Sequence, residues 1–280
     1  MIASDPPATF DPRLLGGDFE RGSDGVWYAR ERESVSYPEE GNADCFEFED
    51  DSFWFAHRGA CLAAVVRRFP PAGALFDIGG GNGFVARTLI DAGFPTVLVE
   101  PGEVGARNAR QRGLPAVICA TLAGAHVHSE ALPAVGLFDV LEHLDRDADF
   151  LAEVHRCLVP SGRLYITVPA FSWLWSDADV TAGHFRRCTL AGWQKRVEAA
   201  GFAPLFASYF FSALPLPVLA LRALPSLFGR RALPQKKYAR SHQPRARWLT
   251  DGIWAAELRR LENGRAIPFG SSCLLVVEKR

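Results

Sequence analysis

The chain has 280 residues, of which 48% are hydrophobic and 22% are charged, and its formal net charge is −1 at pH 7. This length suits one large domain or a core domain with a cap, and the hydrophobic content is sufficient for a well-buried core. Because the net charge is close to zero, no overall positive field would hold nucleic acid, and no nucleic-acid partner is expected.

The six cysteines predict neither a disulfide framework nor a metal site, because none of them forms a C-x-x-C pair or a His/Cys cluster. Several lie in apolar runs, where a free cysteine behaves as a small core residue, and such usage suits a reducing compartment. Residues 1–13 carry no charged-then-apolar signal peptide. The sequence therefore predicts a cytoplasmic protein without a metal.

The predicted elements begin after a Gly-, Pro- and Asp-rich stretch, residues 1–25, which is typical of a mobile terminus. A helix is expected from about residue 52 to 69, where Pro70 and Pro71 end it. Strands at 74–78, 96–100, 116–119, 134–140 and 163–168 then alternate with helices at 83–92, 102–112 and 146–158. This alternation predicts a parallel sheet covered by helices on both faces. A helix at 189–200, a strand at 203–211 and a closing strand at 272–278 are expected to follow.

The segment from Leu75 to Phe84 carries the strongest functional signal. It predicts a strand, a tight turn with glycines at alternate positions, and a helix, and such glycines let a ligand approach the main chain closely. Glu100 closes the next apolar run, where an acid can accept hydrogen bonds from ribose hydroxyls. Asp77 beside the turn would repel a pyrophosphate, but it suits a ligand that carries an ammonium group. S-adenosylmethionine has both the ribose and the ammonium.

The run Asp77-x-Gly79-x-Gly81-x-Gly83 resembles the first motif of class I S-adenosylmethionine-dependent methyltransferases. Three later segments resemble further motifs of this family in the same order: Val99-Glu100-Pro101, the DVLEH segment within 136–144, and the turn and strand at 158–169. The resemblance covers about residues 60–205 and implies a three-layer α/β sandwich, Rossmann-like, with a seven-stranded, mostly parallel sheet. It implies an N-terminal extension and lid at 1–58, a cofactor-binding core at 59–211, a helical cap insertion at 212–268, and a final antiparallel core strand at 269–280.

The resemblance also assigns residues to the cofactor, S-adenosylmethionine. The expected contacts are Asp77, Gly79, Gly81, Glu100, Pro101, Thr121, Phe138 and Asp139. Asp77 is expected at the methionine end and Glu100 at the ribose hydroxyls. The chain departs from many relatives after the third strand, where it has no acid for the adenine amine, so backbone groups or Thr121 would serve there. For Asp139 a structural role is the alternative.

The segment after the fifth strand, residues 173–188, resembles the D…GHxRRY stretch of one bacterial methyltransferase group, with Cys188 in place of the tyrosine. His184 is the first candidate for a general base and His143 the second. The alternatives are a hydrogen-bonded structural role for His184 and a loop-capping role for His143. The expected acceptor contacts are Trp54, His57, Trp175, Asp179 and Arg187. For the first two, the alternative is that their helix simply packs on the sheet.

The apolar run from Tyr209 to Phe228 is too interrupted by prolines to span a membrane. It could form a cap that lines an apolar acceptor pocket, an interfacial membrane segment, or a contact in a homodimer. The basic run at 230–247 follows, and it is either a solvated face or a site for a phosphate, a carboxylate or anionic lipid headgroups.

Together these features predict in-line methyl transfer from S-adenosylmethionine to a small or medium organic acceptor. One alternative is a lipid-linked or glycolipid substrate methylated at the membrane surface, and another is a non-catalytic S-adenosylmethionine-binding protein. A nicotinamide-dependent oxidoreductase is also considered, and Asp77 counts against it.

Overall fold

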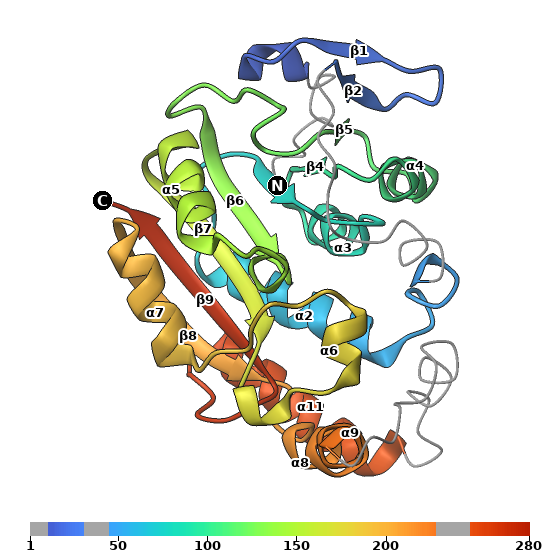
Figure 1. The fold of residues 1–280 in the computed structure, drawn as a ribbon, viewed down its shortest axis with the longest axis vertical. Helices are drawn as coiled ribbons and strands as arrows, with labels where there is room; N and C mark the ends of the chain where they lie inside the picture. Colours follow the sequence, from blue (N-terminus) through green and yellow to red (C-terminus); the bar gives the residue numbers. More distant parts are fainter. Residues whose placement is uncertain (1–10, 31–44, 228–246) are drawn as a thin grey trace, which may run out of the picture.

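The computed structural model describes residues 11–30, 45–227 and 247–280. Within these residues, one nine-stranded sheet has the order β1-β2-β5-β4-β3-β6-β7-β9-β8 (Figure 1). The strands are β1 (Phe19–Arg21), β2 (Trp27–Ala29), β3 (Leu75–Ile78), β4 (Thr96–Val99), β5 (Val117–Cys119), β6 (Leu132–Phe138), β7 (Leu158–Pro169), β8 (Phe202–Phe210) and β9 (Ser272–Lys279).

Helices surround this sheet, as a Rossmann-like α/β fold requires. The α-helices are α2 (Phe53–Arg68), α3 (Phe84–Asp91), α4 (Glu103–Gln111), α5 (Asp147–Cys157), α6 (Asp177–Thr181), α7 (Leu190–Ala199), α8 (Pro215–Val218), α9 (Leu224–Leu227) and α11 (Arg247–Glu262). The shorter helical turns are η1 (Pro12–Leu15), η2 (Leu141–His143), η3 (Ser172–Leu174) and η4 (Leu219–Ala223).

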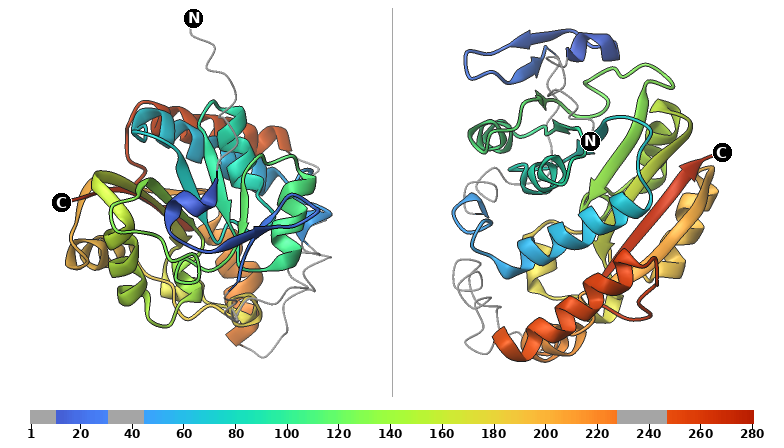
Figure 2. Two further views of the ribbon diagram at one scale, coloured as in Figure 1. Left: turned by 90° about the horizontal axis from the view of Figure 1, so that it is seen from above. Right: turned by 180° about the vertical axis from the view of Figure 1, so that it is seen from behind.

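The centre of the sheet is parallel and buried on both faces. All four residues of β3 are buried, and β3 pairs in parallel with β4 on one side and β6 on the other. Helices α5 and α7 contribute core residues on one face, such as Leu151 and Trp193, while α2 and α11 contribute Leu62 and Leu261 on the other (Figure 2). Near-continuous apolar strands of this kind need helices on both sides, which confirms the predicted layers.

The last strand, β9, runs antiparallel between β7 and β8, as the resemblance implied. Tyr165 of β7 is paired with Val276, and Ala207 of β8 is paired with Leu275. Strand β9 is buried at Ser272–Val277, so it closes the core at this edge of the parallel region.

The sheet has nine strands where seven were expected, because residues 12–29 form η1 and the β1–β2 hairpin rather than a mobile tail. Strand β2 pairs in parallel with β5, with Trp27 opposite Ile118. Phe19 and Val26 are buried against the core, and this burial holds the hairpin on the sheet edge. Strands of three residues are too short to give an alternation that sequence can reveal.

The apolar segment after β8 folds into the short elements α8, η4 and α9, and α11 then packs against α2 (Figure 2). The predicted basic run at 230–247 lies outside the residues whose side chains are described. Among the described residues, none of the helices combines the length and the apolar character needed to cross a bilayer.

Candidate active site

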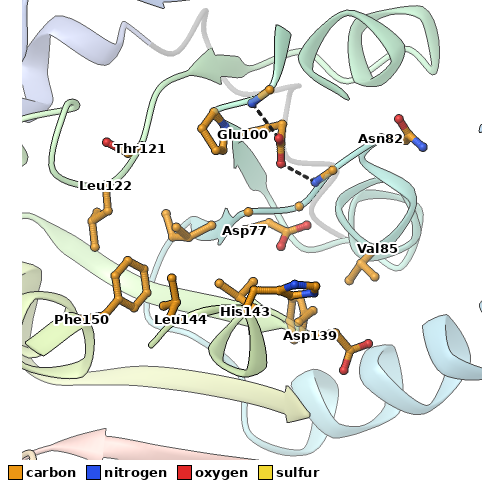
Figure 3. Close-up of a pocket in the computed structure, with 18 of the residues that line it drawn as sticks. Asp77, Asn82, Val85, Glu100, Thr121, Leu122, Asp139, His143, Leu144 and Phe150 are labelled. Atoms are coloured by element: carbon orange, nitrogen blue, oxygen red, sulfur yellow. Dashed lines mark hydrogen bonds between the residues drawn. The ribbon is translucent and has the colours of Figure 1, made fainter. Parts of the chain in front are cut away.

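A cavity of about 860 Å³ opens at the carboxyl ends of β3, β4, β5 and β6 (Figure 3). In open parallel sheets this edge is where ligands bind. Ten of the residues singled out from the sequence line the cavity: Trp54, Asp77, Gly79, Gly81, Glu100, Pro101, Thr121, Phe138, Asp139 and His143. The cavity therefore brings together all eight predicted cofactor residues.

Asp77 lies at the end of β3 with its side chain fully buried in the wall of the cavity. Neither carboxylate oxygen has a hydrogen-bond partner within the described part of the chain. Burial raises the pKa of Asp77 to about 7, which the nearby Arg58 opposes and the nearby Glu100 reinforces. A buried carboxylate without a partner is costly, and a cationic ligand group in the cavity would remove that cost.

Glu100, which follows β4, is fixed by the main chain on both sides. Its Oε2 accepts a hydrogen bond of 2.8 Å from the N–H of Gly81, and its Oε1 accepts one of 2.8 Å from the N–H of Gly102 (Figure 3). Burial raises its pKa, and the two N–H groups oppose that rise. Each oxygen keeps a second lone pair, so Glu100 can still accept hydrogen bonds from ligand hydroxyls.

The turn between β3 and α3 needs glycine for its backbone conformation. Gly79 and Gly81 have φ of +71° and +55°, values that side chains rarely tolerate. A Cβ atom on Gly79 would also lie 3.0 Å from Val140, at the mouth of the site. The turn thereby keeps backbone next to the cavity instead of side chains.

A cluster of polar side chains that the sequence analysis did not predict forms hydrogen bonds with Asn82 of the glycine turn. Asn82 donates to Glu49 at 3.0 Å and accepts from Asn108 at 2.9 Å. Arg112 also donates to Glu49, at 2.9 Å. Both Asn82 and Glu49 line the cavity. No local pattern links residues so far apart in the chain, so only the fold reveals the cluster.

The far end of the cavity is apolar. Leu122, Leu144 and Phe150 line it, on the same side as Thr121 (Figure 3). The Thr121 hydroxyl accepts a hydrogen bond of 2.9 Å from the N–H of Gly124, so it stabilises its own loop. A flat, largely apolar ring such as adenine fits this end of the cavity.

At the opposite end, Arg58 of α2 forms a buried ion pair with Asp139. The Arg58 Nη2 atom lies 2.7 Å from Asp139 Oδ2, and the guanidinium lies over the Trp54 ring at 5.3 Å. Asp139 has a φ of +61°, which turns the chain sharply after β6. Arg58 was not among the predicted site residues, although Trp54 of the same helix was.

His57, the neighbour of Arg58, does not line the cavity. Its Nε2 atom lies 2.8 Å from Glu257 Oε1 of α11, and Glu257 also accepts from the N–H groups of Phe211 and Ser212. This arrangement agrees with the packing alternative for His57.

The remaining predicted residues form a hydrogen-bonded cluster around Asp179 of α6. Asp179 Oδ1 accepts from His184 Nδ1 at 2.8 Å and from Arg187 Nε at 2.6 Å, while Oδ2 accepts from the N–H of Ser176. Burial alone would raise the pKa of Asp179, but His184 and Arg187 hold it below its ordinary value. Trp175 is half-buried beside the cluster, and it does not line the cavity.

His184 and His143 meet edge to face, with ring centroids 4.7 Å apart. Burial and the nearby His184 together lower the pKa of His143 to about 4. His143 is therefore neutral at pH 7 and lines the cavity, while His184 is held by Asp179 just behind it. Glu142 groups with these two histidines and lies near Arg58, and burial raises its pKa well above the ordinary value.

Comparison with known proteins gives one family and one fold. Residues 54–205 match the family model described as a methyltransferase domain. No curated protein matches the sequence. A SAM-dependent methyltransferase from Thermotoga maritima is similar in structure, with a TM-score of 0.55, 17% identity, and coverage of 86% of this chain and 99% of that chain.

Two further solved structures share the fold. A SAM-dependent methyltransferase from Archaeoglobus fulgidus has a TM-score of 0.51 and 16% identity, and the match covers 78% of this chain and 93% of that chain. The [4+2]-cyclase SpnF has a TM-score of 0.52 and 22% identity, with 81% of each chain covered. One fold thus carries different reactions, so the reaction must be argued from the site itself.

Proposed function

This chain belongs to the methyltransferase domain family, and from that premise we propose that it transfers a methyl group from S-adenosylmethionine to a small or medium organic acceptor. The observation that carries the proposal is the pair of acids at adjacent strand ends. Asp77 is a buried carboxylate without a partner among the described residues, and Glu100 is held by the glycine turn beside it.

Three regions of the cavity correspond to the three parts of this cofactor, which are the methionine moiety, the ribose and the adenine. Asp77 takes the ammonium of the methionine moiety, Glu100 accepts from the ribose hydroxyls, and the apolar end at Phe150 holds the adenine. A dinucleotide fits less well, because its pyrophosphate would face the carboxylate of Asp77 across the glycine turn.

The methyl group of S-adenosylmethionine is already activated by its sulfonium, so the protein contributes mainly alignment and the exclusion of water. Positioning of this kind can lower a barrier by roughly 7–11 kcal/mol. Where the acceptor is a hydroxyl, His184 is our candidate base, because Asp179 accepts from its Nδ1 and leaves Nε2 free to take a proton. His143, neutral at pH 7, is the second candidate.

Calorimetric titration of the full chain with S-adenosylhomocysteine and, separately, with NADH tests the cofactor. We expect a micromolar dissociation constant for S-adenosylhomocysteine and no binding of NADH. Transfer of a labelled methyl group to candidate acceptors then tests the reaction. Tight NADH binding without S-adenosylhomocysteine binding would favour the oxidoreductase instead. Cofactor binding without transfer to any acceptor would favour the non-catalytic alternative.

A second candidate acceptor class is a lipid-linked molecule, and the segment 214–227 favours it. Leu216, Leu221, Leu224 and Leu227 are 69%, 74%, 43% and 78% exposed, an unusual concentration of apolar surface. The segment contacts α6, the helix that carries the predicted acceptor residue Asp179, because Ser226 accepts from the N–H of Asp177.

Flotation with anionic lipid vesicles tests this second candidate. The wild type should float with the vesicles, and a variant with Leu221→Glu and Leu227→Glu should not. Sedimentation of the same two proteins tests the alternative that this surface is a homodimer contact. In that case the wild type would be dimeric and the variant monomeric.

A further inference from the structure

A cluster of three side chains with metal-binding chemistry lies beside the cavity. Glu142 and His143 belong to η2, and His184 lies in the loop after α6. Each offers one ligand atom, and these atoms all lie within 4.8 Å of one another. The spacing of 41 residues between the two histidines hides this grouping from any sequence pattern.

The Glu142 carboxylate is 1% exposed, and neither of its oxygens has a hydrogen-bond partner among the residues that the structure describes. The nearby guanidinium groups of Arg58 and Arg187 favour the charged form of Glu142, but each is already paired with another acid. Arg58 lies 2.7 Å from Asp139, and Arg187 lies 2.6 Å from Asp179. A charge buried in this way requires a cation or a proton.

Each of the two histidines makes a hydrogen bond that holds its ring. His184 Nδ1 is bonded to Asp179 Oδ1 at 2.8 Å, and His143 makes a hydrogen bond with the backbone of Ala182. Metal-ligating histidines typically have the second ring nitrogen held by a carboxylate or a backbone carbonyl, which fixes the ring and directs the first nitrogen at the ion. His184 has this arrangement, because Asp179 holds its Nδ1 atom.

The other cluster of similar composition, His57, Cys61 and Glu257, lacks this feature. Glu257 accepts hydrogen bonds from His57 and from the N–H groups of Phe211 and Ser212, so its carboxylate is already stabilised within the protein. The contrast singles out Glu142 as the carboxylate whose surroundings call for an additional partner.

We propose that Glu142, His143 and His184 bind a divalent transition-metal ion such as Zn²⁺ or Fe²⁺. Two histidines and one carboxylate form the ligand set of open sites, which keep positions for an exogenous ligand. His143 lines the cavity, so an ion bound here would lie next to the cavity. This departs from the expectation of a metal-free protein, which rested on cysteine spacing alone.

The role of the ion rests on the proposed methyltransferase function. A bound divalent cation lowers the pKa of a coordinated hydroxyl or water, so an oxygen acceptor would lose its proton at the metal. The two histidines would then act as ligands rather than as general bases. The acceptor class that fits is an oxygen nucleophile, such as a phenol or an enol, with a second oxygen that completes the coordination.

Titration of the chelator-treated full chain with Co²⁺, followed by visible absorption, tests the site without any acceptor or cofactor. We expect d–d bands that saturate at a single equivalent and that Zn²⁺ displaces. Glu142→Gln and His184→Gln should each weaken Co²⁺ binding by at least about 100-fold, since each removes a ligand. His128→Ala, which removes an exposed histidine elsewhere, should bind as the wild type does.

Titration with S-adenosylhomocysteine on the same samples separates failure of this proposal from failure of the proposed function. Variants that bind S-adenosylhomocysteine normally are folded, so their loss of Co²⁺ bands reports on the ligands. Wild type that binds S-adenosylhomocysteine but gives no Co²⁺ bands would overturn the metal site and leave the methyltransferase proposal intact. Bands that persist in both Glu142→Gln and His184→Gln would also overturn it.

Discussion

Replacement of Asp77 by asparagine should stabilise the protein without cofactor and weaken the binding of cofactor. Asn has the shape of Asp but no charge. In the free protein the ionised Asp77 carboxylate is buried and has no hydrogen-bond partner among the described residues. The same charge is what we propose faces the cofactor ammonium, so a single substitution should move stability and affinity in opposite directions.

The magnitude follows from the pKa of Asp77, which burial raises from 3.8 to about 7. Between these values the folded state holds the proton while the unfolded state has lost it. The free energy of unfolding therefore falls as pH rises through this window and levels off above about pH 7. About 3 pH units at 1.36 kcal/mol each give a cost of about 4 kcal/mol at pH 8. Asparagine carries no charge, so Asp77→Asn does not bear the cost of burying an ionised carboxylate. Its buried amide has no partner, however, and this costs about 1–3 kcal/mol at any pH.

The cost of burying the amide is the same at every pH, so it cancels when the stability of the variant relative to the wild type is compared at two pH values. From about pH 5 to about pH 8, the stability of Asp77→Asn relative to the wild type should rise by about 3 kcal/mol. Urea unfolding followed by tryptophan fluorescence measures this, with Asp91→Asn as the control because the Asp91 side chain is 55% exposed. The affinity for S-adenosylhomocysteine at pH 8 should fall at least about tenfold, since a charge-assisted hydrogen bond contributes about 1.5–3 kcal/mol. A relative stability that does not change with pH, together with unchanged affinity, would refute the reasoning.

Three further predictions concern the same rim. The wild-type affinity for S-adenosylhomocysteine should fall about tenfold from about pH 8 to about pH 6, because Asp77 must lose a proton before it meets an ammonium, and Asp77→Asn should show no such dependence in calorimetry. Glu100→Gln should weaken the same binding about 10–100-fold, because one amide oxygen cannot accept from the N–H groups of both Gly81 and Gly102. An affinity equal to that of the wild type would argue against the role assigned to Glu100. Asp179→Asn should lower the free energy of unfolding by about 3–5 kcal/mol at pH 7, because it leaves the buried Arg187 without its carboxylate. This loss should shrink when urea unfolding is repeated below about pH 4, where the lowered pKa of Asp179 is approached and the wild type also loses the charge.

The parallel core and the acids at its edge could be predicted from the sequence because their signals are local. A buried strand is a short apolar run, and a turn that needs positive φ is marked by glycine, as at Gly79 and Gly81. Parallel strands end at one edge, so Asp77 and Glu100 had to meet there once both runs were identified. The position of the last strand came from family resemblance, and the register of β9 with β7 and β8 confirms it.

The rest depended on packing between residues far apart in the chain. Asn82 and Glu49 are 33 positions apart, and His57 and Glu257 are 200 apart. The first pairing depends on where the segment before α2 meets the turn after β3, and the second depends on how α11 packs against α2. No local periodicity encodes either contact. The β1–β2 hairpin escaped prediction for the opposite reason, since its strands have three residues each and carry almost no pattern.

The surroundings of the buried carboxylates at this site distinguish Asp77 and Glu142 from their neighbours. Asp139 and Asp179 are paired with arginines, whereas the carboxylates of Asp77 and Glu142 have no hydrogen-bond partner among the described residues. One cofactor ammonium can neutralise only one carboxylate, and Asp77 is the one beside the glycine turn. Glu142 then requires its own explanation. His143 and His184 offer ligand atoms within 4.8 Å of the Glu142 carboxylate, which favours a metal ion at Glu142 and leaves Asp77 for the organic cation of the cofactor.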